Sequence, residues 1–291
     1  MSNKYWIGLV FCLLLCGSCK EKKKKVLPKT DQKEVKTIKK KLDVTIYRYE
    51  QALFRIDRKN IGNELNRLKK DYALFLGENP NTQENIRQLE GFIDYHVHQD
   101  LYKAVQKQFP SIDYMEDEFS DAFSLIKYHF PQADFPNIYT AILGLDFENP
   151  IIYQDTFLII ALDMYLGADF SYYKQLGLQV PAYIIRKFSK EYILRDCIKA
   201  LAYPYMQFNR NNNTLLDEMI IEGKRLMFAE IALPNLHDTI LSGYTLEEWE
   251  WAEENEANIW TYMIDKNYLY TYDNTSIIKF IKEAPFTAYF G

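Results

Sequence analysis

The sequence predicts a mainly helical α+β fold, with one domain over residues 42–291 and a small buried sheet. Its composition, 48% hydrophobic and 15% aromatic, is sufficient for a large core in a body of this length. Two apolar runs, at 138–145 and 157–166, are short and rich in β-branched or aromatic residues, which is typical of buried strands. Most other apolar residues recur at helical spacing, and after Pro181 this spacing continues almost throughout.

The body opens with a predicted strand and continues with helices. Residues 42–49 alternate between apolar and polar side chains, which is the pattern of a half-buried strand. Apolar residues at helical spacing then predict helices around 61–68, over 89–105 and over 119–130, before the two buried strands. Further helices are expected at about 183–209, 214–232, 245–269 and 275–282, separated by Asn211-Asn212-Asn213, Pro234 and Gly243.

The N-terminus has the pattern of an exported bacterial lipoprotein. An apolar run from Tyr5 to Leu15 is followed by the sequence CGSC at 16–19 and a group of lysines. Small residues before a cysteine predict a signal peptide at 1–18 and lipid attachment at Cys19. The apolar run is shorter than the roughly 20 residues that span a bilayer, so a transmembrane helix is disfavoured. One position departs from the usual lipobox, because Cys16 stands where leucine is typical.

The charge of the chain is unevenly distributed. Residues 20–41 hold eleven lysines and three acidic residues, few large apolar residues, and therefore no means of forming a core. We interpret residues 19–41 as a lipidated, lysine-rich tether that is attracted to anionic headgroups. Since the whole chain carries −5, residues 20–41 carry +8 and Lys4 carries +1, residues 42–291 carry −14. An acidic body disfavours nucleic acid as a partner.

Recognisable catalytic motifs are missing, and the cysteines and histidines do not suggest a metal site. Cys197 is the one cysteine left after lipidation and lies in an apolar helical pattern, so we interpret it as core. His96 and His98 lie two apart in a predicted helix and would point to different faces, although in a strand they would share one. His129 and His237 are expected at the surface or at a cap. No cofactor is predicted.

Two carboxylates interrupt apolar segments. Asp163 follows Ile159-Ile160-Ala161-Leu162, and Glu222 follows Met219-Ile220-Ile221. A buried carboxylate must find hydrogen-bond donors or a cation. We therefore expect Asp163 and Glu222 to bind backbone amides or to pair with a nearby lysine or arginine, and to fix the fold.

These segments also carry a family resemblance. The resembling blocks are the lipobox, His129-Phe130-Pro131, Leu162-Asp163-Met164-Tyr165-Leu166-Gly167, Met219-Ile220-Ile221-Glu222-Gly223-Lys224, Trp251 with Asn255-Glu256 and Ile259-Trp260, and Ala284-Pro285-Phe286. In order and spacing they resemble the gliding-motility lipoprotein GldB family of Bacteroidetes from residue 19 to the end. Family members continue beyond the last block, whereas this chain stops at Gly291, which implies a truncated or incomplete version.

The GldB resemblance implies a cell-envelope lipoprotein that acts as a non-enzymatic component of the gliding motility and type IX secretion machinery. Its expected partners are the membrane, through the N-terminal lipid, and other gliding and secretion envelope proteins. The tether lacks the acidic run expected of surface-exported lipoproteins in this group, so the body is expected to face the periplasm. In the aromatic-rich segment from Trp249 to Tyr272, we expect some aromatic side chains to lie in the core and others to form a surface for partners.

A second resemblance supplies the alternative, a divergent or degenerate metallopeptidase-like hydrolase. Residues 190–194, followed about thirty residues later by Glu222, resemble the gluzincin layout of zinc peptidases, in which two histidines and a downstream glutamate bind zinc. Lys190 and Leu194 occupy both histidine positions, so the metal ligands are absent. The resemblance implies a degenerate zincin-like scaffold with a buried polar site of Asp163, Lys190, Glu191 and Glu222, in which Lys190 pairs with Glu222. A hydrolase would use Glu191, Glu222 or the His96/His98 pair.

Overall fold

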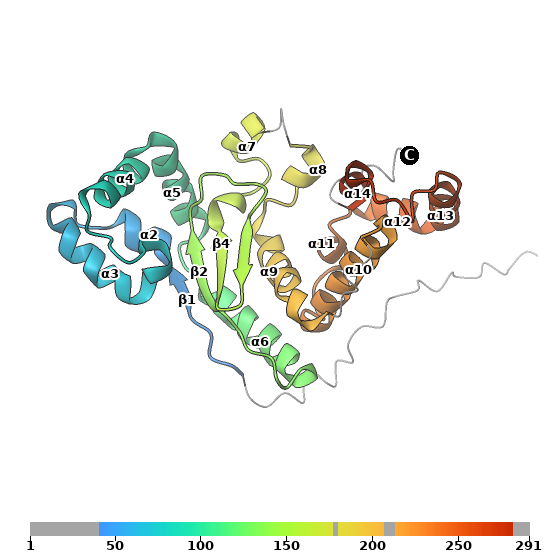
Figure 1. Cartoon of the computed structure of the whole chain (residues 1–291), viewed down its shortest axis with the longest axis horizontal. Helices are drawn as coiled ribbons and strands as arrows, with labels where there is room; N and C mark the ends of the chain where they lie inside the picture. The colour runs from blue at the N-terminus through green and yellow to red at the C-terminus, as the bar shows by residue number, and fades with distance from the viewer. Residues whose placement is uncertain (1–40, 177–179, 207–212, 282–291) are drawn as a thin grey trace, which may run out of the picture.

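The computed structural model describes residues 41–176, 180–206 and 213–281 (Figure 1). The predicted signal peptide, the lipidation residue Cys19 and the tether up to residue 40 lie outside the described residues. Within the described part of the chain, no helix is both long enough and apolar enough to cross a membrane.

The centre of the fold is a four-stranded mixed sheet (Figure 1). Its strands are β1 (Ile46–Arg48), β2 (Asn137–Ala141), β3 (Ile151–Gln154) and β4 (Phe157–Ala161), in the order β1-β2-β4-β3. β1, β2 and β4 are parallel, and β3 forms an antiparallel hairpin with β4. The register places Ile138 beside both Ile46 and Leu158, so the apolar side chains of three strands form one continuous surface.

Both faces of the sheet are covered, which explains why the interior strand β4 is a continuous apolar run. Ala141 and Ile159 pack into one hydrophobic cluster with the first helices of the body. Ile138, Leu158 and Ile160 pack into the larger cluster on the opposite face. The first cluster is covered by α2 (Tyr49–Phe54), α3 (Ile61–Leu76) and α4 (Gln83–Asp94), and the second by α5 (His96–Gln108), α6 (Asp113–His129), α9 (Ile193–Leu201) and α10 (Leu215–Ala232).

The C-terminal helices extend from α10 on the side of the sheet opposite α2–α4 (Figure 1). They are α11 (Asp238–Ser242), α12 (Leu246–Glu254), α13 (Glu256–Asp265) and α14 (Asn274–Ile281). Thr214 and Thr245 form capping boxes with Asp217 and Glu248, and these caps fix where α10 and α12 begin. Short elements connect the larger ones: η1 (Arg58–Asn60), η2 (Leu162–Met164), α7 (Ser171–Leu176), α8 (Ala182–Ile185), η3 (Lys190–Tyr192) and η4 (Tyr203–Tyr205).

The predicted fold class is confirmed, since the protein is mainly helical with one small buried sheet. Several predicted elements are wrong in their limits. The helix expected over 89–105 is two helices, because Tyr95 is extended and ends α4. The strand expected over 157–166 stops at Ala161, where η2 begins, and the strand expected over 42–49 covers only β1. The helix expected over 183–209 is broken into α8, η3, α9 and η4, and the one over 245–269 divides at Asn255.

Candidate functional site

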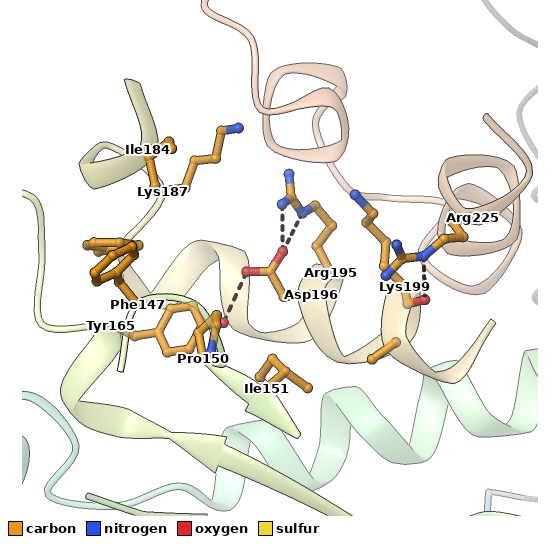
Figure 2. Close-up of a pocket in the computed structure, with 12 residues that line it drawn as sticks. Phe147, Pro150, Ile151, Tyr165, Ile184, Lys187, Arg195, Asp196, Lys199 and Arg225 are labelled. Atoms are coloured by element: carbon orange, nitrogen blue, oxygen red, sulfur yellow. Dashed lines mark hydrogen bonds and ion pairs between the residues drawn. The ribbon is translucent and has the colours of Figure 1, made fainter. Parts of the chain in front are cut away.

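A pocket of about 290 Å³ lies between the β3 end of the sheet, α8, α9 and α10 (Figure 2). One side is apolar and includes Phe147, Pro150 and Ile151 from the segment that leads into β3, with Ile184 from α8. The other side is strongly cationic and is formed by Lys187, Arg195, Lys199 and Arg225, with the carboxylate of Asp196 among them. The pocket therefore combines an apolar wall with a concentration of positive charge.

Helix α9 positions three of these side chains. Arg195 and Lys199 are four residues apart and Asp196 and Lys199 are three apart, so all three lie on one side of the helix. The opposite side carries Cys197, Ile198 and Leu201, which are buried in the large core cluster. Burial raises the pKa of the Cys197 thiol well above its usual value, which keeps it in the neutral, unreactive form. The prediction that Cys197 is a core residue is confirmed.

Arg195 is almost completely buried, and its guanidinium is held by several acceptors. Its Nε and Nη2 both donate to Asp196 Oδ1, at 2.8 and 2.5 Å. Its Nη1 donates to the carbonyl oxygens of Ile240 and Leu241 near the end of α11. The other carboxylate oxygen of Asp196 accepts a hydrogen bond from the buried Tyr165 hydroxyl at 3.0 Å. Burial alone would lower the pKa of Arg195, but the Asp196 carboxylate outweighs this effect and raises it.

Glu222 from α10 holds the other two cations. Its Oε1 pairs with the Lys199 ammonium, and its Oε2 accepts a hydrogen bond from Arg225 Nη1 at 3.2 Å. Arg225 Nε also donates to the carbonyl oxygen of Lys199 at 3.2 Å, which ties α10 to α9. Burial lowers the pKa of Lys199, although the Glu222 charge acts in the opposite direction. The expectation that Glu222 pairs with a nearby lysine or arginine is confirmed.

Lys187 differs from these cations because no carboxylate of the described residues lies within ion-pair distance of its ammonium. Its Nζ lies over the Tyr183 ring, 5.6 Å from the centroid. Burial and the neighbouring charges of Arg195 and Lys199 lower the pKa of Lys187 to about 8. Lys187 is therefore a cation held near other cations in a partly desolvated place.

Gly243 allows the positive groups to approach one another. It has a φ of 78° and ends α11, a backbone conformation that glycine adopts most readily. A Cβ atom at this position would lie 2.9 Å from Lys187 Cε and 3.2 Å from Arg195 Nη1. The space that a side chain would occupy is thus filled by Lys187 and Arg195.

The second predicted carboxylate, Asp163, lies elsewhere and has a structural role. Its carboxylate is fully buried and accepts hydrogen bonds from the backbone amides of Leu143 at 3.1 Å and Leu145 at 2.7 Å. Burial raises the pKa of Asp163, and these amides limit the increase. The expectation that Asp163 binds backbone amides and fixes the fold is confirmed.

The interpretation of Lys190 and Glu191 as members of a buried polar site is wrong. Both side chains are exposed, in the turn η3 that precedes α9. Glu222 pairs with Lys199 and Arg225 instead of Lys190. Residues 190–192 also lack the α-helical conformation that the gluzincin layout requires, so the structure separates the residues that this resemblance would bring together.

The histidines also have structural surroundings. His98 Nδ1 lies 2.8 Å from the Phe92 carbonyl oxygen, which can only accept, so Nδ1 carries the proton. His96 is the first residue of α5, and its ring contacts Tyr95. His237 accepts a hydrogen bond from the Thr239 amide and caps α11, as expected. Among the described residues, no group of three or more His, Cys, Asp or Glu side chains is arranged to hold a metal ion.

Sequence reasoning missed the cationic side of the pocket. The signal that was present is three charged residues, Arg195, Asp196 and Lys199, which interrupt the apolar helical pattern between Ile193 and Leu201. Buried charges need partners, so such an interruption indicates an ion-pair cluster. Nothing in the local sequence of Lys187 shows that it lies beside this cluster, because the contact depends on the packing of α8, α9 and α11.

Comparisons with known proteins identify the family. The family described as "Gliding motility protein GldB" matches residues 29–291, which include every element from β1 to α14. A search of curated proteins found no match, and neither did a search of solved structures. The chain belongs to the GldB family of gliding-motility lipoproteins.

Proposed function

We propose that this protein is a non-enzymatic binding component of the gliding and type IX secretion machinery, anchored through lipid on Cys19 with its body in the periplasm. The observation that carries the proposal is the family match over residues 29–291. Membership in this family implies a lipid-anchored protein of the cell envelope. Its proposed partners are the membrane, through the lipid, and other gliding and secretion proteins of the envelope.

The surroundings of the best hydrolase candidates support a non-enzymatic role. Asp163 is engaged by two backbone amides, and Glu222 is engaged by Lys199 and Arg225. Glu191, which stands where a zinc peptidase has its general base, is exposed in a turn. Each carboxylate therefore has a structural partner or lies apart from the others.

The C-terminal helices supply a surface suited to protein partners. Trp260 is 40% exposed, Ile264 58%, Tyr270 72% and Tyr272 69%. Aromatic side chains are enriched in protein interfaces, where a few of them provide most of the binding energy. The exposed members of the aromatic-rich segment are therefore proposed contacts for envelope proteins.

The experiment is deletion of the gene, followed by measurement of colony spreading and of secreted protein. Complementation uses the wild-type gene, Cys19→Ala and Glu191→Gln. The proposal predicts loss of spreading and secretion, recovery with the wild type and with Glu191→Gln, and no recovery with Cys19→Ala. Normal spreading in the deletion strain would contradict the gliding role. Failure of Glu191→Gln at normal protein level would favour the hydrolase instead.

A further inference from the structure

We infer that the pocket between α8, α9 and α10 binds a small soluble phosphomonoester, with Lys187 as its principal contact. This inference goes beyond the role in gliding. It does not depend on that role, because it is tested by ligand binding to the purified protein. It rests on the balance of charge around the pocket, on the hydrogen-bond donors that remain available, and on the shape and polarity of the walls.

The first argument is charge. The cationic groups that meet at the pocket and directly beside it are Arg186, Lys187, Arg195, Lys199 and Arg225. Three carboxylates pair with them: Glu248 with Arg186, Asp196 with Arg195, and Glu222 with both Lys199 and Arg225. Two positive charges therefore remain uncompensated within the described structure. A phosphomonoester carries a charge of about −1.5 to −2 at neutral pH, which matches this excess.

The second argument is the supply of donors. An ammonium group has three hydrogen-bond donors, and that of Lys187 donates to no acceptor among the described residues. Lys199 uses its ammonium on Glu222 and retains further donor capacity. Arg195 differs, because its guanidinium is committed to Asp196 and to two carbonyl oxygens. Lys187 and Lys199 are thus the groups available to an anion, and Arg195 contributes a fixed charge behind them.

The third argument is the local arrangement of the cations. Lys187 Nζ and Arg195 Nη1 lie 3.3 and 3.2 Å from the point that a Cβ on Gly243 would occupy, so the two charges converge there. In Figure 2 the side chains of Lys187, Arg195 and Lys199 extend into the same region of the pocket. Holding like charges together costs free energy. An anion bound between these cations would reduce that repulsion, so the arrangement favours anion binding.

The fourth argument is size and polarity. A volume of about 290 Å³ is close to the lower limit of about 300 Å³ for small-molecule sites, and suits a phosphate group with a compact organic part. Phe147, Pro150 and Ile151 provide an apolar wall for that organic part. The negative charge of the body as a whole disfavours large polyanions, whereas the field inside the pocket acts only over a short range.

Calorimetry on the purified full-length protein in detergent micelles tests the inference with three probes. Phenyl phosphate supplies both the dianion and an apolar ring, inorganic phosphate supplies the dianion alone, and benzoate supplies a ring with one negative charge. We expect phenyl phosphate to bind more tightly than either of the other probes. Tighter binding of inorganic phosphate would overturn the assignment of an organic ligand, and tighter binding of benzoate would overturn the assignment of a dianion.

Two variants locate the site. Lys187→Met removes the charge and keeps the length of the side chain, and we expect it to weaken phenyl phosphate binding at least tenfold. Lys190→Met is the matched control, since it removes an exposed lysine three residues away that does not line the pocket. The control should retain wild-type affinity within about twofold. Thermal unfolding of both variants establishes that they are folded.

Two results would overturn the inference. One is the absence of binding by the wild type at millimolar phenyl phosphate. The other is equal binding by the wild type and Lys187→Met. Should Lys187→Met fail to fold, the affinity of the wild type at pH 7 and pH 9.5 serves instead, and an affinity that does not fall at the higher pH would overturn the role of Lys187. None of these measurements depends on the outcome for gliding.

Discussion

The carboxylate of Asp163 binds the backbone amide of Leu145 at 2.7 Å, and Leu145 is one of two non-glycine residues with positive φ among those the structure describes. Leu145 has a φ of 65°, and the preceding Gly144 has a φ of 77°. Left-handed backbone at a leucine costs roughly 1–2 kcal/mol. Asp163 offsets this cost through its hydrogen bonds to Leu143 and Leu145, so a carboxyl group in the apolar core stabilises the loop that follows β2.

Replacement of Asp163 by Asn tests this relationship. The amide keeps the shape of the carboxylate but presents an NH2 group to one of two backbone donors, which leaves a buried donor without its acceptor. We expect a loss of about 2–3 kcal/mol in the free energy of unfolding. Urea denaturation measures this loss of stability. Asp155→Asn is the matched control, because Asp155 is exposed in the β3–β4 turn, and it should change stability by less than about 0.5 kcal/mol. Equal effects would contradict the role of Asp163.

Gly144→Ala tests the same loop from its other side. A Cβ on Gly144 would lie 3.1 Å from His98 Nε2, and the φ of 77° is unfavourable for alanine. We expect destabilisation by about 1–2 kcal/mol in urea denaturation. Gly91→Ala gives the opposite expectation, since Gly91 lies inside α4 and a Cβ there meets nothing within 4 Å. Alanine should stabilise this helix by about 0.5–1 kcal/mol. A destabilised Gly91→Ala variant would contradict the conclusion that glycine is required at Gly144 but not at Gly91.

The role of Asp163 was predictable because a single charge in an apolar run must be buried and must find donors. The hydrogen-bond partners of Asp163 were not predictable, since the amides of Leu143 and Leu145 reach its carboxylate only because the chain leaves β2 in a left-handed turn. The limits of β4 were missed for a related reason. Leu162 and Met164 are as apolar as the strand before them, so the pattern does not show that the backbone turns into η2 at Leu162.

The partner of Glu222 shows a different limit of sequence reasoning. A cation was expected, but Lys190 was chosen through the zinc-peptidase resemblance, whereas Lys199 makes the pair. The choice depends on where α9 begins. Because residues 190–192 form η3 and α9 starts at Ile193, Lys199 lies on the face that packs against α10. A helix boundary displaced by a few residues thus changes the predicted partner.

A double-mutant cycle on Glu222→Gln and Lys199→Met measures this ion pair. The side chains are 26% and 14% exposed, so the pair is neither fully buried nor at the open surface. We expect a coupling energy of about 1–2 kcal/mol, between the values typical of exposed and of buried pairs. The double variant should lose less stability than the sum of the two single variants, because the ion pair is lost only once. Glu222→Gln leaves the Lys199 ammonium without its carboxylate, whereas Lys199→Met leaves Glu222 with Arg225 alone. A coupling energy near zero would contradict the contact.

Trp260→Ala tests the proposed partner surface. Trp260 is 40% exposed on α13, so its removal should cost about 1–2 kcal/mol in the free energy of unfolding, less than the loss of a core residue. Colony spreading of a strain that carries only this variant should nevertheless fall, since exposed aromatic residues provide much of the binding energy of interfaces. Met263→Ala is the contrasting variant, because Met263 is 5% exposed and its loss should lower stability by about 2–4 kcal/mol. Normal spreading with Trp260→Ala would contradict a contact at this residue.

The stability of the protein should depend on the titration of Lys187. Its pKa is about 8 in the folded protein, against 10.5 for an unperturbed lysine. Between these two values the unfolded chain holds a proton that the folded protein has released, so stability from this group rises as the pH increases from about 8 to 10.5. Below pH 8 both states are protonated, and the full cost of holding the Lys187 charge beside Arg186, Arg195 and Lys199 is present. Asp196 offsets only part of it.

Lys187→Met removes that cost. We expect the variant to be more stable than the wild type at pH 7, by up to about 3 kcal/mol, and the difference to shrink towards pH 10 as the wild-type ammonium loses its proton. Urea denaturation of both proteins at pH 7, 8, 9 and 10 measures the difference, in which the titration of other groups cancels. A constant difference across this range would contradict the lowered pKa. Phenyl phosphate should narrow the difference at pH 7, because the anion binds more tightly to the protein that retains Lys187 and so stabilises it more.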